Sequence, residues 1–296
     1  MTDGRHPQPP PQSRGGRSRL GSRLGLAGLI GPPLLWLGVL YLGSLAALFI
    51  TSLWTTGPFG QGVARIWNLD NYRELFTVEV YRTITFRTLV TAISVTVIDA
   101  VLAFPIALYI AKVASPRMRR ILVILAITPL WASYLVKAYA WRGMFSSSGP
   151  VAWLAHPFGL DTPGYGLLAT VVTLAYLWLP YMILPMYAGL ERLPDSLLEA
   201  SADLGAGAGM TLRRIIVPVL FPAFVAGSIF TFSLTLGDYI AVKIVGGANQ
   251  MLGNVVYDSF LTGNNLPFAA AVSTIPVVIM LAYLTAVRRT GALENL

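Results

Sequence analysis

Residues 199–205 read Glu-Ala-Ser-Ala-Asp-Leu-Gly, and nine residues later residues 215–222 read Ile-Ile-Val-Pro-Val-Leu-Phe-Pro. The first part is polar with a helical pattern, and the second begins a long apolar run. The pattern predicts a short ordered helix at a membrane surface, wedged between two membrane spans. Such a helix is a place where another protein can push on the membrane part of the chain.

The composition around this stretch is that of a membrane protein. Of the 296 residues, 55% are apolar and only 11% are charged, whereas soluble domains carry about 25% charged residues. A membrane-spanning helix needs roughly 20 mostly apolar residues. We therefore predict an all-α integral membrane protein with six spans within residues 25–290, the first of them uncleaved. The expected spans are residues 25–53, 87–113, 120–142, 165–189, 215–239 and 267–287.

The positive charges predict the orientation of these spans. Of the 21 lysines and arginines, 14 fall on the side of the termini and 7 on the opposite side. The positive-inside rule therefore places both termini in the cytoplasm. The net charge of +8 lies beside apolar runs, which favours a topology signal next to lipid over a nucleic-acid surface. We expect residues 1–24 to be a disordered basic cytoplasmic tail and residues 291–296 a short cytoplasmic tail.

The signatures of common enzyme sites are missing. The chain has no cysteine, and none of its three lysines follows a glycine as a phosphate-binding loop requires. The run Gly205, Gly207 and Gly209 has no strand before it, so it is a weak dinucleotide signal. A catalytic triad would need His156, which lies in an expected outer loop. We therefore expect a chain that is not an enzyme and binds no cofactor or metal itself.

The cytoplasmic insert, about residues 190–214, has its own local signals. Asp195 after Pro194 is typical of a helix N-cap, Gly205 suits the left-handed position after the last turn, and Thr211 is a possible cap of the next helix. Helical spacing predicts an apolar face and a polar face, formed by Leu197, Ala200, Ser201 and Leu204 and by Ser196, Glu199 and Asp203 respectively. The alternative is a simple connector lying on the membrane, although connectors usually need only a few residues.

At this insert the sequence resembles a known family. Glu199-Ala200-Ser201, Gly205, Ile215, Val217 and Pro218 match the Glu-Ala-Ala…Gly…Ile-x-Leu-Pro signature of permease subunits of binding-protein-dependent ABC importers. Ser201 stands for the second alanine and Val217 for the leucine. The resemblance implies a type I-like permease with a coupling helix that docks into a cytoplasmic ATPase. The residues it implicates in coupling are Glu199, Ala200, Ser201, Asp203, Gly205 and Pro218.

Other segments resemble the spermidine/putrescine permeases within this family. They are residues 179–187, 129–131, 136–141 and 237–240. Permeases for iron, thiamine, phosphonate and opines share much of this pattern, so a polyamine is one expected solute among several. The resemblance further implies a bacterial inner membrane location, two ATPase subunits that use ATP, a second permease subunit and an extracytoplasmic substrate-binding protein.

Polar groups inside the expected spans mark a candidate translocation path, because ionisable groups in a membrane usually face a pore or a partner. Asp238 ends a stripe formed with Ser228, Thr231 and Thr235 at helical spacing, with Trp131 as a further candidate. The alternatives are hydrogen bonds across a helix interface and a solvated Asp238. For Asp99, pairing with Lys137 or a hydroxyl is the alternative to a direct role.

A transporter driven by an ion gradient is the rival from another class. It would explain the intramembrane acids, but it predicts paired broken spans in inverted repeats, which the sequence does not display. It also leaves the insert unexplained. A membrane enzyme ranks third, because no nucleophile or metal set is found.

Overall fold

The computed structural model describes residues 19–57, 62–159 and 162–289, with side chains from residue 28 onwards. Internal contacts divide the chain after Leu48 into two units, which are considered separately. The predicted disordered tail over residues 1–24 and the predicted C-terminal tail over residues 291–296 lie largely outside the described residues. Residues 19–24, however, are helical.

The first unit is helical and apolar. It contains α1 (Arg19–Leu37), a π-helical turn η1 (Gly38–Leu42) and most of α2 (Gly43–Ser52), which continues across the unit boundary. Residues Gly28–Ser52 are long and apolar enough to span a membrane. This segment matches the first expected span, residues 25–53.

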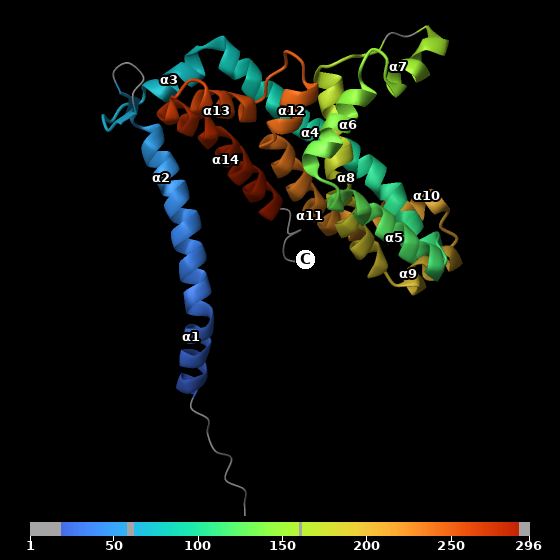
Figure 1. The fold of residues 1–296 in the computed structure, drawn as a ribbon. Helices are drawn as coiled ribbons and strands as arrows, with labels where there is room; N and C mark the ends of the chain where they lie inside the picture. Colours follow the sequence, from blue (N-terminus) through green and yellow to red (C-terminus); the bar gives the residue numbers. More distant parts are fainter. Residues whose placement is uncertain (1–18, 58–61, 160–161, 290–296) are drawn as a thin grey trace, which may run out of the picture. The chain divides into compact units, whose positions relative to one another are not determined.

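The second unit is a helical bundle with one short hairpin (Figure 1). The hairpin pairs β1 (Thr55–Thr56) with β2 (Val63–Ala64) in antiparallel register. Among the helices, the short α3 starts at Asp70, in the polar stretch that follows Trp67. The remaining elements are α3 (Asp70–Thr77), α4 (Glu79–Leu108), η3 (Tyr109–Val113), α5 (Pro116–Trp131), α6 (Tyr134–Met144), α7 (Pro150–Ala155), η4 (His156–Phe158), α8 (Leu167–Glu191), α9 (Asp195–Asp203), α10 (Ala208–Thr211), η5 (Leu212–Ile216), α11 (Val217–Leu236), α12 (Ile240–Val245), α13 (Leu252–Leu261) and α14 (Leu266–Arg288).

Five helical segments in the described residues are long and apolar enough to cross a membrane, and a bent pair of helices, Pro116–Trp131 and Tyr134–Met144, makes a sixth if it is taken as one broken span. Besides Gly28–Ser52, the segments are Glu79–Val113, Leu167–Glu191, Ala208–Leu236 and Leu266–Arg288. The expectation of an all-α membrane protein is confirmed. The second span begins at Glu79 rather than near residue 87, because the helix continues through a polar first turn that hydropathy alone does not include.

The third expected span, residues 120–142, is not one straight helix; its residues form the bent pair α5 and α6, which is called the third crossing below. Helices α5 and α6 meet at an angle of 94°, and Ala132 between them is extended, with ψ 140°. The Lys137 ammonium donates a hydrogen bond to the Pro129 carbonyl oxygen at 3.0 Å. A carbonyl freed near the end of α5 is thereby satisfied, which a break at membrane depth requires.

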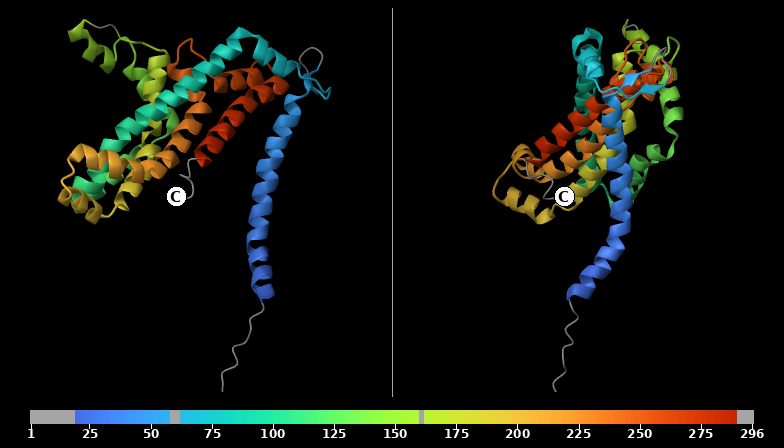
Figure 2. Two further views of the ribbon diagram at one scale, coloured as in Figure 1. Left: turned by 180° about the vertical axis from the view of Figure 1, so that it is seen from behind. Right: turned by 90° about the vertical axis from the view of Figure 1, so that its left-hand side faces the viewer.

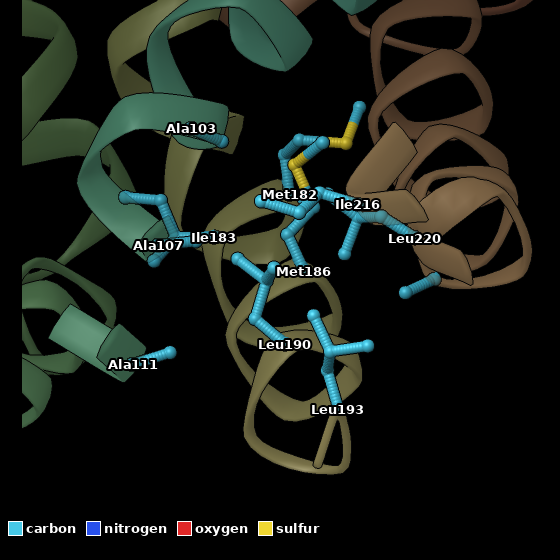
Figure 3. Packing of buried hydrophobic residues seen from close by; sticks show 11 residues of the cluster. Ala103, Ala107, Ala111, Met182, Ile183, Met186, Leu190, Leu193, Ile216 and Leu220 are labelled. Atoms are coloured by element: carbon cyan, nitrogen blue, oxygen red, sulfur yellow. The ribbon is translucent and has the colours of Figure 1, made fainter. Parts of the chain in front are cut away.

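Helices α4, α8 and α11 form the centre of the bundle, and small residues let them approach closely. Figure 3 shows Ala103 and Ala107 of α4 facing Met182, Ile183 and Met186 of α8, all buried. In a membrane, helix association depends on close van der Waals packing, because lipid is as apolar as the side chains. The alanines on α4 therefore suit this contact.

The second unit has two distinct ends. Helices α9 and α10 and the corner between α4 and α5 gather at one end, while α3, α7, α12 and α13 lie at the other (Figures 1 and 2). The polar groups described next lie either at the α9 end or between the spans.

Candidate functional site

The insert between α8 and α11 folds as a short helix, a bend and a second helical turn. Helix α9 begins at Asp195, and Pro194 is its N-cap with extended backbone, φ −65° and ψ 137°. Asp195 is therefore the first helical residue, and the expectation that it caps the helix is wrong. The fixed φ of Pro194 suits a residue that leads into a helix.

The C-terminal end of α9 forms a complete Schellman motif. Gly205 has φ +75°, and its N–H donates to the Ala202 carbonyl oxygen at 2.8 Å, while the Ala206 N–H donates to Ser201 at 3.0 Å. These are the two bonds that define the motif. The predicted left-handed position of Gly205 is confirmed.

Thr211 does not cap the next helix, because it is the last residue of α10 and Gly207 is the N-cap. Its hydroxyl lies 2.8 Å from the Ser201 hydroxyl, and Ser201 is buried. The two hydroxyls tie α9 to α10 across the glycine-rich bend. Ser201 therefore has a structural contact that an alanine at this position would lack.

Most of the insert surface is open. Leu198 packs against the buried cluster of α4, α8 and α11, whereas Leu197 is 45% and Leu204 is 87% exposed. Glu199, Ala200, Asp203 and Pro218 are also exposed. Of the predicted apolar face, Leu197, Ala200 and Leu204 are thus exposed, and only Ser201 is buried. Helix α9 presents both leucine and carboxylate side chains outwards.

Asp195 connects the insert to the end of α4. Its Oδ1 atom lies 2.7 Å from Lys112 Nζ. The hydrogen bond and charge of Lys112 hold the pKa of the Asp195 carboxyl below its usual range. In the sequence Lys112 is only one of the 14 positive charges that predict the orientation, since no local pattern connects Lys112 with Asp195, which lies far along the chain.

The polar stripe of α11 is buried inside the chain. Ser228, Thr231 and Thr235 are each at most 1% exposed. The Ser228 hydroxyl lies 2.6 Å from the Tyr283 hydroxyl on α14, and the Thr231 hydroxyl donates to that of Thr96 on α4 at 3.4 Å. Those two contacts match the alternative of hydrogen bonding across helix interfaces. A role of the stripe in a solute path stays a prediction.

Asp238 follows α11 and fixes the break in the third crossing. It is 7% exposed, so the alternative of a solvated carboxylate is wrong. The Tyr134 hydroxyl donates a hydrogen bond to Asp238 and accepts one from the Ala241 N–H at 3.1 Å. Tyr134 also stacks on Trp178, with ring centroids 5.8 Å apart. A carboxylate bonded to one ring of a stacked aromatic pair is chemically suited to an organic cation.

Asp99 is completely buried in α4, and neither carboxylate oxygen has a hydrogen-bond partner among the described residues. The expected pairing with Lys137 or a hydroxyl is therefore wrong, since Lys137 bonds to Pro129 instead. Trp131, the last residue of α5, is 88% exposed. The structure thus does not bring Asp99, Trp131 and Asp238 into one hydrogen-bonded cluster.

Comparison with known families decides the class of this protein. Residues 81–289 match the family described as binding-protein-dependent transport system inner membrane component. The chain belongs to this family. The permease is thus an integral inner membrane subunit of an ABC importer, and its function is in transport rather than chemistry.

Individual relatives cover most of the permease. It is 41% identical to the inner membrane ABC transporter permease protein YdcU of Escherichia coli over 288 residues, which is 92% of each chain. It is 31% identical to the spermidine/putrescine transport system permease protein PotB of the same organism, over 88% of this chain and 95% of PotB.

Solved structures share the fold of the permease at low sequence identity. A bacterial alginate ABC transporter in complex with an alginate pentasaccharide-bound periplasmic protein matches with a TM-score of 0.66 and 16% identity, over 90% of this chain and 93% of that chain. An inward-facing MetNI methionine ABC transporter matches with a TM-score of 0.58 and 17% identity, over 74% of this chain and all of that chain. These similarities support the membrane-permease fold alone.

Proposed function

We propose that the permease forms half of a solute pore with a second permease subunit and that α9 is its coupling helix. Cytoplasmic ATPase subunits would bind α9 and use the ATP, while a substrate-binding protein would deliver solute at the other end. The observation that carries this proposal is the surface of α9, whose exposed Leu204 and carboxylates lie on a helix fixed at both ends. Exposed apolar side chains that are surrounded by polar side chains are typical of protein interfaces.

The charges at the α9 end support a cytoplasmic position for it. The corner between α4 and α5 carries Lys112, Arg117, Arg119 and Arg120, and η5 carries Arg213 and Arg214. By the positive-inside rule this end faces the cytoplasm. Six crossings would then return the chain to the same side, with both termini cytoplasmic.

The solute that we infer is a polyamine. Two arguments support it: the similarity to PotB, and the buried carboxylate of Asp238, which accepts a hydrogen bond from Tyr134, itself stacked on Trp178. A polyamine carries several ammonium groups, which favour carboxylates and aromatic faces. Another small solute carried by the same family is the second candidate, because YdcU, at higher identity, is named without a solute.

Reconstitution tests the proposal directly. The permease, its second permease subunit and its ATPase would be placed in vesicles, with the binding protein and labelled putrescine outside. We expect ATP-dependent putrescine uptake that needs the binding protein. ATP-dependent uptake of a different solute would overturn the polyamine assignment. Uptake by the permease alone under a proton or sodium gradient would overturn the class of mechanism.

Removing the charge of Asp238 is expected to slow uptake of a cationic solute. In Asp238→Asn the amide oxygen can still accept the Tyr134 hydrogen bond, while the amide nitrogen replaces the oxygen that accepts from the Ala241 N–H, so the variant removes the charge and one hydrogen bond. We expect putrescine uptake below saturation to fall on the order of tenfold, equivalent to about 1.4 kcal/mol. The measurement is the initial rate of labelled putrescine uptake.

The matched control for this variant is Asp258→Asn. Asp258 lies on α13 and pairs with Lys243 at 3.1 Å near the surface, so its loss should change uptake little. Equal rates in Asp238→Asn and the unmodified permease would remove Asp238 from the solute path.

A further inference from the structure

The end of α4 is joined to the coupling segment by one lysine. Lys112 lies in the π-helical turn η3, and its side chain is 14% exposed. Its Nζ atom donates hydrogen bonds to the Leu193 carbonyl oxygen at 2.6 Å and to Asp195 Oδ1 at 2.7 Å. Both acceptors lie at the start of the insert, on either side of Pro194. Lys112 therefore holds the entry to α9 from the side of α4.

The acceptors of Lys112 differ in strength. Asp195 is 77% exposed on its side chain, and exposed ion pairs contribute little. Leu193 is buried, and a hydrogen bond from an ammonium to a shielded carbonyl is among the stronger protein hydrogen bonds. The bond to the Leu193 carbonyl should therefore make the larger contribution to holding α9.

A second cation, Arg119, holds the turn at the end of α4 in place. Arg119 of α5 donates to the Ile110 carbonyl oxygen at 3.1 Å and to that of Ala111 at 2.8 Å. These carbonyls belong to the last turn of a helix, where intrahelical partners are missing. Arg119 also lies 3.9 Å from Glu191, the last residue of α8. The turn that carries Lys112 is thereby fixed to α5 and lies against α8.

Apolar packing also connects α9 with the ends of α4 and α8. Ala107 and Ala111 of the α4 segment share one buried cluster with Leu190 and Leu193 at the end of α8, and Leu198 of α9 packs against that cluster. Figure 3 shows Ala107 and Ala111 on the α4 segment and Leu190 and Leu193 at the end of α8. A displacement of α9 thus meets both an apolar contact and the polar bonds of Lys112.

We propose that Lys112 is a positioning residue that makes α9 and the end of α4 move together, so that movement of the coupling helix reaches the central helices of the bundle. The proposal rests on the proposed function, because it assumes that an ATPase moves α9. It adds the route by which that movement enters the membrane part. Lys112 touches neither solute nor nucleotide in this role.

The first test measures coupling in the complete reconstituted complex. Solute uptake and ATP hydrolysis would be recorded in the same vesicles for Lys112→Met, Lys112→Arg and Asp195→Asn. We expect Lys112→Met to lower the solute carried per ATP hydrolysed at least fivefold while ATP hydrolysis continues. Lys112→Arg should restore most of this ratio, and Asp195→Asn should stay within twofold of the unmodified complex.

The matched control is Lys243→Met, which removes a lysine that also has one ion pair, with Asp258 at 3.1 Å, but lies on α12 at the other end of the bundle. Its ratio of solute to ATP should not change. A normal ratio in Lys112→Met would overturn the proposal, since a merely structural lysine would lower protein yield without changing the ratio.

A second measurement needs no ATPase and separates the two proposals. The chain has no cysteine, so spin labels can be attached to Val113→Cys and Ser196→Cys, both exposed positions, in the full-length permease. We expect a narrow distance distribution that broadens in Lys112→Met and narrows again in Lys112→Arg. An unchanged distribution in Lys112→Met would overturn the connection, whereas failure of ATP-driven uptake by the unmodified complex would overturn only the proposed function.

Discussion

Gly205→Val is expected to remove most of the solute-stimulated ATP hydrolysis of the reconstituted complex. Gly205 has φ +75° in the Schellman motif that ends α9. A left-handed conformation costs an ordinary residue about 1–2 kcal/mol, and a β-branched residue is an outlier there. The bend would shift to relieve this strain, and α9 would no longer present Leu204 at the same place. We expect stimulation to fall about tenfold.

Two further variants make this result specific to the backbone conformation. Gly207→Val adds the same side chain two residues later, where φ is −69° and ψ is 160°, a conformation that valine adopts readily. Nothing lies within 4 Å of a Cβ atom at either glycine, so crowding does not differ between them. Gly205→Asn should keep much of the stimulation, because asparagine tolerates the left-handed region. Normal stimulation in Gly205→Val would contradict the coupling role of α9.

Gly227→Val is expected to destabilise the whole bundle. Gly227 of α11 lies against α8 so closely that a Cβ atom would be 2.6 Å from Met182 Sδ and 3.1 Å from Met182 Cα. The sulfur can move, but the backbone can do so only if the helices separate. Overpacking of this kind typically costs about 1–3 kcal/mol. The measurement is the thermal unfolding midpoint of the purified permease in detergent, which should fall.

Gly143→Val is the matched control for this effect on packing. Gly143 also lies inside a helix, α6, and nothing lies within 4 Å of a Cβ atom there. Gly143 lies in the last turn of α6, so Gly143→Val adds the same side chain to a helix without the clash. Equal unfolding midpoints for the two variants would show that the α8–α11 contact is looser than the structure describes.

The long spans were predictable because hydropathy reports length and composition. Residues 165–189 and 267–287 were expected to span, and the structure has Leu167–Glu191 and Leu266–Arg288. The left-handed Gly205 was also predictable, since only a local conformational preference decides it. The break at Ala132 was not predictable, because the contact that holds it joins Tyr134 to Asp238, far apart in the chain.

The candidate site was predictable in its members but less so in their contacts. The residues that the family resemblance implicates in coupling lie close together in the chain, with Glu199 to Asp203 on α9 and Gly205 just after it. The stripe of Ser228, Thr231 and Thr235 has the expected spacing, but its burial depends on which neighbours pack against α11. Spacing determines which residues share a helix face and does not say what that face meets. The contacts of Lys112 with Leu193 and Asp195 were not predictable for the same reason.

The bent third crossing has a consequence for how the chain enters the membrane during synthesis. Helix α5 has 16 residues and reaches about 24 Å even when upright, which is less than the roughly 30 Å of hydrocarbon. The remainder turns aside into α6, which carries Lys137 and Arg142. We therefore expect this segment to insert into lipid less readily by itself than the five straight segments, and later helices that pack against it to shelter its polar groups.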